Sequence, residues 1–180
     1  MTRSISTGAY VLRLTLTLFL ITTIVAGLLG LVNYVTADTI AEQIAQKAEN
    51  AMRQVLEADS YEPLDVLEES AVTAAYRAGD RGYVVRVAPN GFGGAIDMMV
   101  GVDVSGAVTG VAIVSQSETA SLGANCTRED FRAQFTGKTG TLSVSKDGGE
   151  IEALTGATVT SRAVTEGVNT ALEFVQEVLK

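Results

Sequence analysis

The feature that most constrains the fold is an uncharged run near the N-terminus. From Leu14 to Val35 the chain reads LTLTLFLITTIVAGLLGLVNYV, without a single Asp, Glu, Lys or Arg. At about 1.5 Å rise per residue, a helix of this length spans a hydrocarbon core of roughly 30 Å. The apolar region of a signal peptide is shorter, about 7–15 residues, although a weak cleavage-like sequence (VTA) stands at the end of the run. We therefore expect residues 14–35 to form a single transmembrane anchor.

The charges that flank this run predict its orientation. Arg3 and Arg13 precede it, whereas Asp38 and Glu42 are the first charged residues after it. Positive residues beside a membrane helix remain on the cytoplasmic side. We therefore expect the N-terminus to lie in the cytoplasm. Everything after the run should lie on the outer side of the cell membrane, in the periplasm or outside the cell.

Small and polar residues inside the run leave two interpretations open. Ala26 and Gly30 form a small-xxx-small pair, and Thr15, Thr17 and Thr22 add hydroxyl groups. Such residues allow a second helix to approach closely and to form hydrogen bonds across the contact. Small residues are also common in membrane helices without a specific partner. The sequence therefore indicates a partner helix without requiring one.

The charge balance and two scarce residue types exclude several classes of protein. The chain has 13 Lys and Arg against 21 Asp and Glu, for a net charge of -8. Because nucleic-acid binding needs clustered basic residues, we expect no nucleic-acid partner. The absence of His excludes a His-dependent catalytic triad and a His-ligated metal site, and we expect no metal. Cys126 alone cannot form an internal disulfide; a reactive thiol at a helix start and a half-buried small apolar residue are its two interpretations.

The part of the chain beyond the membrane combines helical and strand patterns. Apolar residues recur every three or four positions over residues 40–55, which predicts a helix that continues from the anchor. From Gly82 the pattern becomes strand-like, and the DVSGA sequence predicts an antiparallel hairpin within residues 95–117. A second hairpin is predicted around Lys146–Gly149.

Two further helices complete the expected fold. Thr127 and Asp130 have the spacing of a capping box before a short helix that carries Phe131 and Phe135 on one face. A last helix runs from about Ser161 to the end, and its apolar face consists of Val164, Val168, Leu172, Val175 and Leu179. We expect an α+β fold, an antiparallel sheet backed by helices. The expected segments are a cytoplasmic N-terminus (1–13), the anchor (14–35), a helical connector (36–80) and an outer domain (81–180).

The segment LTGATVTS, residues 154–161, lies between the last expected strand and the last helix. Gly156 allows a tight turn, and Thr160 or Ser161 can cap the helix. A helix N-terminus favours an anion such as a phosphate, and the Thr158 hydroxyl would lie beside it. A polar turn without any ligand explains the same residues. The segment lacks the glycine spacing of a Walker loop or a dinucleotide fingerprint.

Within this segment, TGATVTS resembles the flavinylation motif Ser/Thr-Gly-Ala-Thr of the FMN-binding domain family. The threonine after the alanine carries FMN through a phosphoester bond in that family, and Thr158 holds this position. A second block, residues 91–123, resembles the family's Gly-rich start, hairpin and Glu-Thr-Pro-Gly-Leu-Gly loop. The order of the two blocks, the single anchor and the length are most similar to the G subunits of Rnf complexes. These complexes are ion-translocating ferredoxin:NAD oxidoreductases, and the G subunits are related to the C subunits of sodium-pumping quinone reductases.

The resemblance implies how a flavin would be held. A separate flavin transferase, with FAD as donor, would attach FMN to Thr158. The residues that would shape the phosphate end are Thr155, Gly156, Ala157, Thr160 and Ser161. The loop that would hold the isoalloxazine ring contains Glu118, Thr119, Leu122 and Gly123, with Leu122 packing on the ring face.

Two positions depart from the family pattern. Glu152 stands six residues before Thr158, where the family usually has Asp, and the resemblance implies that this acid contributes to recognition by the transferase. Ala120 and Ser121 replace the usual Pro-Gly of the second block.

The resemblance implies an electron-transfer subunit rather than a complete enzyme. Electrons would pass through FMN between neighbouring membrane and peripheral subunits, coupled to Na⁺ or H⁺ translocation. Two other functions remain open from the residues alone. A membrane-anchored assembly module without flavin would fit the acidic surface and the hairpins. A Thr or Ser hydrolase would need a lysine base, and Lys138 and Lys146 show no spacing typical of one.

Overall fold

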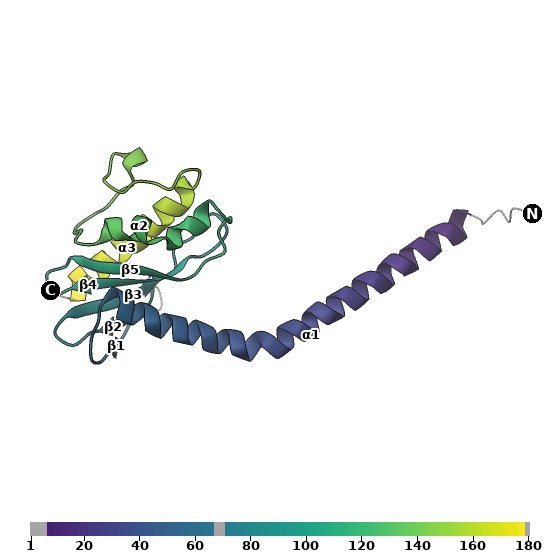
Figure 1. The fold of residues 1–180 in the computed structure, drawn as a ribbon, viewed down its shortest axis with the longest axis horizontal. Coiled ribbons are helices and arrows are strands. Elements are labelled where there is room, and N and C mark those ends of the chain that lie inside the picture. The colour runs from purple at the N-terminus through teal and green to yellow at the C-terminus, as the bar shows by residue number, and fades with distance from the viewer. Residues whose placement is uncertain (1–6, 67–70, 179–180) are drawn as a thin grey trace, which may run out of the picture. The chain divides into compact units, whose positions relative to one another are not determined.

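A computed structural model of the chain describes residues 7–66 and 71–178. The chain divides into two compact units, Met1–Gln43 and Ile44–Lys180. Helix α1 (Thr7–Val55) is 49 residues long and contributes to both units (Figure 1). Over Tyr10–Ala37 it is long and apolar enough to cross a membrane. The expected anchor, residues 14–35, lies within this stretch, whereas Arg3 lies outside the described residues.

The threonine hydroxyls of the apolar stretch have acceptors within their own helix. Thr15 donates to the carbonyl of Val11 at 3.0 Å, and Thr17 donates to that of Arg13 at 2.8 Å. Thr22 donates in the same way to the carbonyl four residues before it, also at 3.0 Å. Because a polar group in hydrocarbon must be hydrogen-bonded, these contacts make the threonines compatible with lipid without a partner helix.

The second unit contains a five-stranded antiparallel sheet in which each strand pairs with the next in sequence (Figure 1). The strands are β1 (Glu62–Leu64), β2 (Val72–Arg77), β3 (Gly82–Val87), β4 (Asp97–Asp103) and β5 (Val108–Ser115). The expected α+β fold with an antiparallel sheet is confirmed. The hairpin β4–β5 is also as predicted, because Asp103 accepts hydrogen bonds from the backbone N–H groups of Ser105 and Ala107. Gly106 completes the turn with φ +83°.

Alternate side chains of a strand lie on opposite faces of the sheet, and the two faces pack against different helices. Val85 and Val87 of β3 belong to the main core, which also contains the buried face of α3 (Thr158–Val178). Val84, between them, belongs to a second cluster with the last turns of α1. This period of two is what a sheet covered on both faces requires. The predicted apolar face of α3 is confirmed from Val164 to Val175; Leu179 lies outside the described residues.

The prediction of a helical connector over residues 36–80 is wrong beyond residue 55. Helix α1 ends at Val55, where the backbone carbonyl accepts a hydrogen bond from the Thr109 hydroxyl at 2.5 Å. A Cβ on Gly101 would lie 2.6 Å from the same oxygen, so glycine there allows the helix end to approach the sheet. Residues 62–64 and 72–77 then form β1 and β2, which the sequence did not predict as strands.

The second predicted hairpin is also wrong. Residues Ser145–Asp147 form a short 3₁₀ helix (η3), and Gly148 has a left-handed conformation with φ +83°. Val144 and Ile151 pair in a single parallel bridge instead of an antiparallel ladder. The carbonyl of Val144 accepts hydrogen bonds from the N–H groups of Asp147 and Gly149, at 2.8 and 3.0 Å, so the segment closes on itself locally instead of pairing as two strands. Residues 137–151 therefore form a loop rather than a hairpin.

The predicted capping box does not form. Helix α2 has only four residues (Glu129–Arg132), and Arg128 rather than Thr127 occupies its N-cap position. Thr127 is instead the last residue of the preceding 3₁₀ helix η1 (Gly123–Thr127), and its hydroxyl donates to the carbonyl of Ala124 within that helix. Residues Ala133–Phe135 continue as the 3₁₀ helix η2. The predicted shared face is confirmed, because the rings of Phe131 and Phe135 pack edge to face with centroids 5.7 Å apart.

Candidate functional site

The site is built around the N-terminus of α3. Gly156 turns the chain with φ +77°, and the N–H of Ala157 donates to the carbonyl of Leu154 at 3.0 Å. The hydrogen bond from the N–H of Ser161 to the carbonyl of Ala157, also 3.0 Å, opens the helix. The backbone N–H groups of residues 158–160 therefore have no acceptor within the helix, and they carry its partial positive charge. Thr158 is the first residue of α3 and its side chain is partly exposed.

The expectation that Thr160 or Ser161 caps the helix is wrong, since α3 begins before both. The Ser161 hydroxyl donates to the carbonyl of Ala157 at 3.0 Å and accepts from the N–H of Leu154 at 2.9 Å. It thereby holds the turn that precedes the helix. The Thr160 hydroxyl points to a tertiary partner instead, and donates to Oε2 of Glu118 at 2.5 Å.

Glu118 is a buried carboxylate, only 8% exposed, that joins three segments. Its Oε2 accepts from Thr160 of α3, and its Oε1 accepts from the backbone N–H of Gly93 at 2.8 Å. The resemblance placed Glu118 in the loop that holds a ring. The structure shows both oxygens occupied by protein donors, so the side chain fixes the positions of the loops around it.

Three glycines allow this close packing. A Cβ on Gly91 would lie 2.3 Å from Oε1 of Glu118, and one on Gly93 would lie 2.2 Å from the carbonyl of Ser117. A Cβ on Gly123 would lie 2.6 Å from both Oε2 of Glu118 and the Thr160 hydroxyl. Any side chain at these positions would displace the carboxylate or the loops that it joins.

An apolar pocket of about 390 Å³ opens beside Thr158. Its lining consists of Phe92, Glu118, Thr119, Leu122, Gly123, Gly156, Ala157, Thr158, Val159 and Thr160. The structure therefore brings the two blocks of the sequence together in one pocket. Of the predicted residues, Thr155, Ser161 and Glu152 do not line it.

Phe92 and Val159 line the pocket although the sequence did not single them out. Neither residue carries a clear local signal. Phe92 lies between glycines in GFGG, which does not show whether its side chain is buried, and a valine at the start of a helix is ordinary.

A second hollow of about 670 Å³ lies on the other side of Leu122, and its lining includes Arg128, Gln134 and residues 152–155. The Gln134 amide holds Glu152 by the backbone, accepting from its N–H at 2.7 Å and donating to its carbonyl at 3.3 Å. The side chain of Glu152 remains exposed. Glu152 and Thr155 thus lie beside Leu122 but in a different hollow from Thr158.

Cys126 is fully buried next to the site. Burial, with a smaller contribution from the negative charge of Glu118, raises the pKa of its thiol from 9.0 to about 11. The thiol is therefore protonated near neutral pH and poorly reactive. Cys126 acts as a small buried apolar residue, and not as the activated thiol that a helix N-terminus would favour.

The residues present fit a phosphorylated flavin. The N–H groups at the start of α3 suit a phosphate, the Thr158 hydroxyl can carry an ester, and the adjacent pocket is mostly apolar. A side chain at Gly156 would strain the left-handed backbone and press on Leu122, because its Cβ would lie 3.1 Å from Cδ2 of Leu122. In the described part of the chain, no group of three or more Cys, Asp or Glu side chains could hold a metal ion.

Two family models match the chain. The FMN-binding domain model matches residues 91–173, which contain the whole pocket. The RnfG N-terminal region model matches residues 1–55, which correspond to α1 and the residues before it.

Curated relatives match over nearly the full length. The G subunit of the proton-translocating ferredoxin:NAD⁺ oxidoreductase complex of Clostridium ljungdahlii is 37% identical, over 91% of this chain and 88% of the relative. The G subunit of the Na⁺-translocating ferredoxin:NAD⁺ oxidoreductase complex of Acetobacterium woodii is 33% identical, over 94% of each chain.

A solved structure shares the fold. The crystal structure of the C subunit of the Na⁺-translocating NADH-quinone reductase from Parabacteroides distasonis aligns with a TM-score of 0.55 at 20% identity. The alignment covers 75% of this chain and 83% of that one. The antiparallel sheet with its helices is therefore a fold that this solved structure shares.

Proposed function

Because this chain belongs to the G-subunit family of Rnf complexes, the ion-translocating ferredoxin:NAD⁺ oxidoreductases, we propose that it relays electrons through FMN esterified to Thr158. Membership of this family supports a role for the chain as an FMN-binding electron-transfer subunit that associates with a membrane. The observation that carries the attachment point is the position of Thr158. It is the first residue of α3 and it lines the apolar pocket.

In the proposed attachment, the Oγ1 of Thr158 attacks the phosphorus of the FMN half of FAD, which a separate flavin transferase supplies. A new P–O bond to Thr158 forms, and the P–O bond to the adenylate half breaks. AMP leaves with the electron pair, and the hydroxyl proton passes to a base of the transferase or to solvent. The chain gains the mass of FMN less one water. Thr158 is partly exposed and the Glu152 side chain is exposed, so both are accessible to such an enzyme. Gln134 holds the backbone of Glu152 through two hydrogen bonds.

The residues around Thr158 then have separate tasks. The N–H groups of residues 158–160 would hold the phosphate, and Gly156 leaves room for Leu122. Thr160 and Ser161 act indirectly, by fixing Glu118 and the turn before the helix. Thr119, Leu122 and Gly123 form the ring-side wall of the pocket. When bound, FMN supplies the capacity to accept and release electrons; the protein supplies its position and its electrostatic surroundings.

The proposed topology follows from the flanking charges. Residues 1–13 lie in the cytoplasm, 14–35 cross the membrane, and the FMN-binding domain, from about residue 81, lies on the outer side with the connecting segment 36–80. A covalent tether retains the flavin where a dissociated one would be lost. The membrane segment has no charged residue between 14 and 35, so Na⁺ or H⁺ crosses through other subunits. Those subunits also deliver and remove the electrons.

The experiment that tests this function replaces Thr158 by alanine in the native complex. We expect the ferredoxin:NAD⁺ oxidoreductase activity of the membranes to fall to background while the other subunits co-purify in unchanged amounts. Thr139→Ala, which removes an exposed hydroxyl outside the site, is the matched control and should retain wild-type activity. Full activity in the Thr158→Ala complex would contradict the relay. It would favour a membrane-anchored assembly module that needs no flavin.

A further inference from the structure

Phe92 is an aromatic side chain that the fold exposes on a firmly held loop. It is 74% exposed. The N–H of Gly91 donates to the carbonyl of Gly94 at 2.8 Å, and the N–H of Gly93 donates to the buried Glu118 at 2.8 Å. These hydrogen bonds hold the backbone on both sides of Phe92, and its side chain lies exposed. A single exposed apolar side chain needs no explanation, whereas a contiguous group of them marks a binding surface.

Phe92 is one of three exposed apolar side chains that surround Thr158. Leu122 is 43% exposed and Val159 is 49% exposed, and all three line the same pocket. They come from three segments of the chain: the loop before β4, the loop after β5 and the first turn of α3. Glu118 joins these segments through Gly93 and Thr160. The protein thus uses one buried carboxylate to present an apolar surface around a hydroxyl.

Leu122 lines both this pocket and the hollow that contains Arg128. That hollow is more polar, with the Arg128–Asp130 ion pair at 2.7 Å and the Gln134 amide, and Thr158 does not line it. A flat aromatic ring on a tether from Thr158 would have the less polar surroundings on the Phe92 side, because Thr158 and Phe92 line the same pocket. An aromatic pair also gains more than its buried area alone provides.

We propose that Phe92 is a positioning residue that packs on the isoalloxazine ring carried by Thr158, so that the ring lies on the Phe92 side of Leu122. This inference rests on the proposed function, because it requires the flavin to be attached. Phe92 does not take part in the attachment. It limits the motion of the attached ring and its contact with water.

The test uses the full-length flavinylated protein in detergent and compares two readouts for each variant. Intact mass reports attachment, and the lifetime-corrected constant for quenching of flavin fluorescence by acrylamide reports the exposure of the ring. We expect Phe92→Ala to keep the mass of attached FMN and to raise the quenching constant at least about twofold, because an aromatic wall is lost. Phe92→Tyr should restore the wild-type constant, since it keeps the ring.

Two controls make the result specific. Val104→Ala shortens another exposed apolar side chain, on the β4–β5 turn outside both hollows, and Arg128→Ala alters the other hollow. Neither should change the quenching constant. An unchanged constant in Phe92→Ala, or an increase in Arg128→Ala alone, would overturn the proposal. Loss of attachment in Phe92→Ala would also overturn it and assign Phe92 to the attachment step. A wild-type chain without flavin, by contrast, would overturn the proposed function itself.

Discussion

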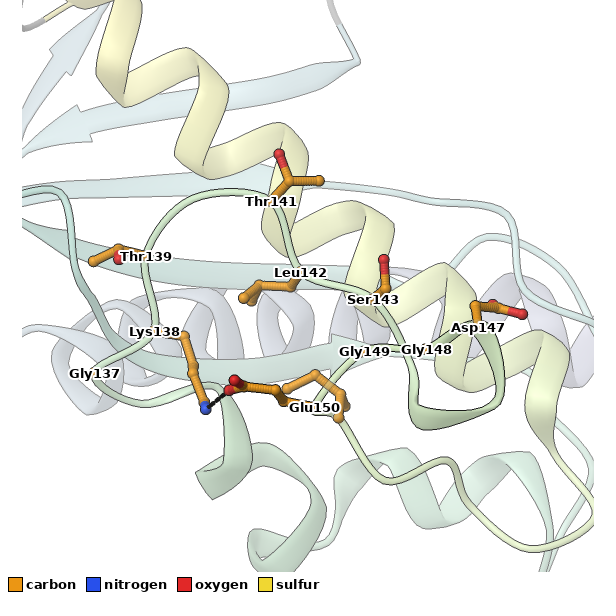
Figure 2. Close-up of a pocket in the computed structure, with 11 residues that line it drawn as sticks. Gly137, Lys138, Thr139, Thr141, Leu142, Ser143, Asp147, Gly148, Gly149 and Glu150 are labelled. Carbon is orange, nitrogen blue, oxygen red and sulfur yellow. Dashed lines mark hydrogen bonds and ion pairs between the residues drawn. The ribbon is translucent and has the colours of Figure 1, made fainter.

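Two hollows of this domain use their charged groups in opposite ways. The loop of residues 137–151 lines a hollow of about 490 Å³, larger than the pocket beside Thr158. Lys138 and Glu150 of this loop form an ion pair at the surface, as Figure 2 shows, and Asp147 pairs with Arg162 of α3. The Asn169 side-chain amide accepts a hydrogen bond from the N–H of Leu142 at 2.8 Å and donates one to its carbonyl at 2.9 Å. These contacts shape the loop itself.

The pocket beside Thr158 reverses this arrangement. Its one carboxylate, Glu118, is buried and fixes the surrounding segments, and Phe92, Leu122 and Val159 are left exposed. An exposed apolar wall costs free energy unless something covers it, whereas an exposed ion pair costs little. The size of a hollow therefore does not identify the functional site here. The exposed apolar side chains around the pocket identify it instead.

The largest expected difference between the two regions is the loss of stability when a carboxylate of each is removed. Glu118→Ala leaves the Thr160 hydroxyl and the Gly93 N–H without their acceptor in a buried place, so we expect a loss of about 2–4 kcal/mol in the free energy of unfolding. Flavin attachment to the remaining folded protein should also fall. Glu150→Ala removes a carboxylate whose side chain is 76% exposed and should leave the thermal midpoint nearly unchanged. Thermal unfolding of both variants in detergent measures the difference, and equal midpoints would contradict the bracing role of Glu118.

Glycine substitutions sharpen the same comparison. A Cβ on Gly123 would lie 2.6 Å from Glu118 Oε2 and the Thr160 hydroxyl, so Gly123→Ala should cost about 1–3 kcal/mol and loosen an attached flavin. Gly140, in the other loop, has φ +71° and open space around its Cβ position. Gly140→Ala should therefore cost only about 1 kcal/mol of backbone strain. If Gly140→Ala weakened flavin binding as much as Gly123→Ala, the two regions would not be independent.

The smallest expected effect is the acid sensitivity of the loop pairs. A hydrogen bond from Arg162 lowers the pKa of Asp147 below 3.8, and one from Lys138 lowers the pKa of Glu150 below 4.5. A carboxyl whose pKa is lower in the folded chain adds stability above its ordinary pKa and loses that contribution as the pH falls through the lowered value. The double variant Asp147→Asn, Glu150→Gln should therefore lose less stability between about pH 5 and pH 3 than the wild type.

Thermal midpoints of the wild type and the double variant across this pH range provide the measurement. Some acid sensitivity should persist in the double variant, because the pKa values of Asp103 and Asp130 are also lowered, by Ser105 and Arg128 respectively. Parallel curves for the two proteins would show that the loop pairs contribute nothing.

Local patterns in the sequence predicted the parts of the fold that local interactions determine. The β4–β5 hairpin follows from the turn at Asp103–Ser105–Gly106, whose hydrogen bonds lie within five residues. The buried face of α3 follows from its apolar spacing. Strands β1 and β2 escaped prediction for different reasons. EPL is short and contains a proline, and VTAAYR combines the strand formers Val, Thr and Tyr with two helix-favouring alanines, so its local signal is ambiguous and pairing in the sheet decides its conformation.

The candidate site shows the same division. The resemblance identified Thr158 and the loop that contains Leu122, and the structure brings them into one pocket. The role of Thr160 could not be predicted, because a helix-capping hydroxyl and one that donates to a carboxylate 42 residues away have the same local sequence. Phe92 was missed for a related reason. Its exposure depends on the packing of its flanking glycines against the Glu118 segment.

The most direct test of the central claim is the intact mass of the chain purified from its native membrane, measured beside a Thr158→Ala variant. We predict that the wild type carries the mass of FMN less one water and that the variant has the mass of the bare polypeptide. A wild-type chain with the bare mass, from cells in which the flavin transferase is present and active, would contradict the claim. The same would follow if the variant carried the added mass.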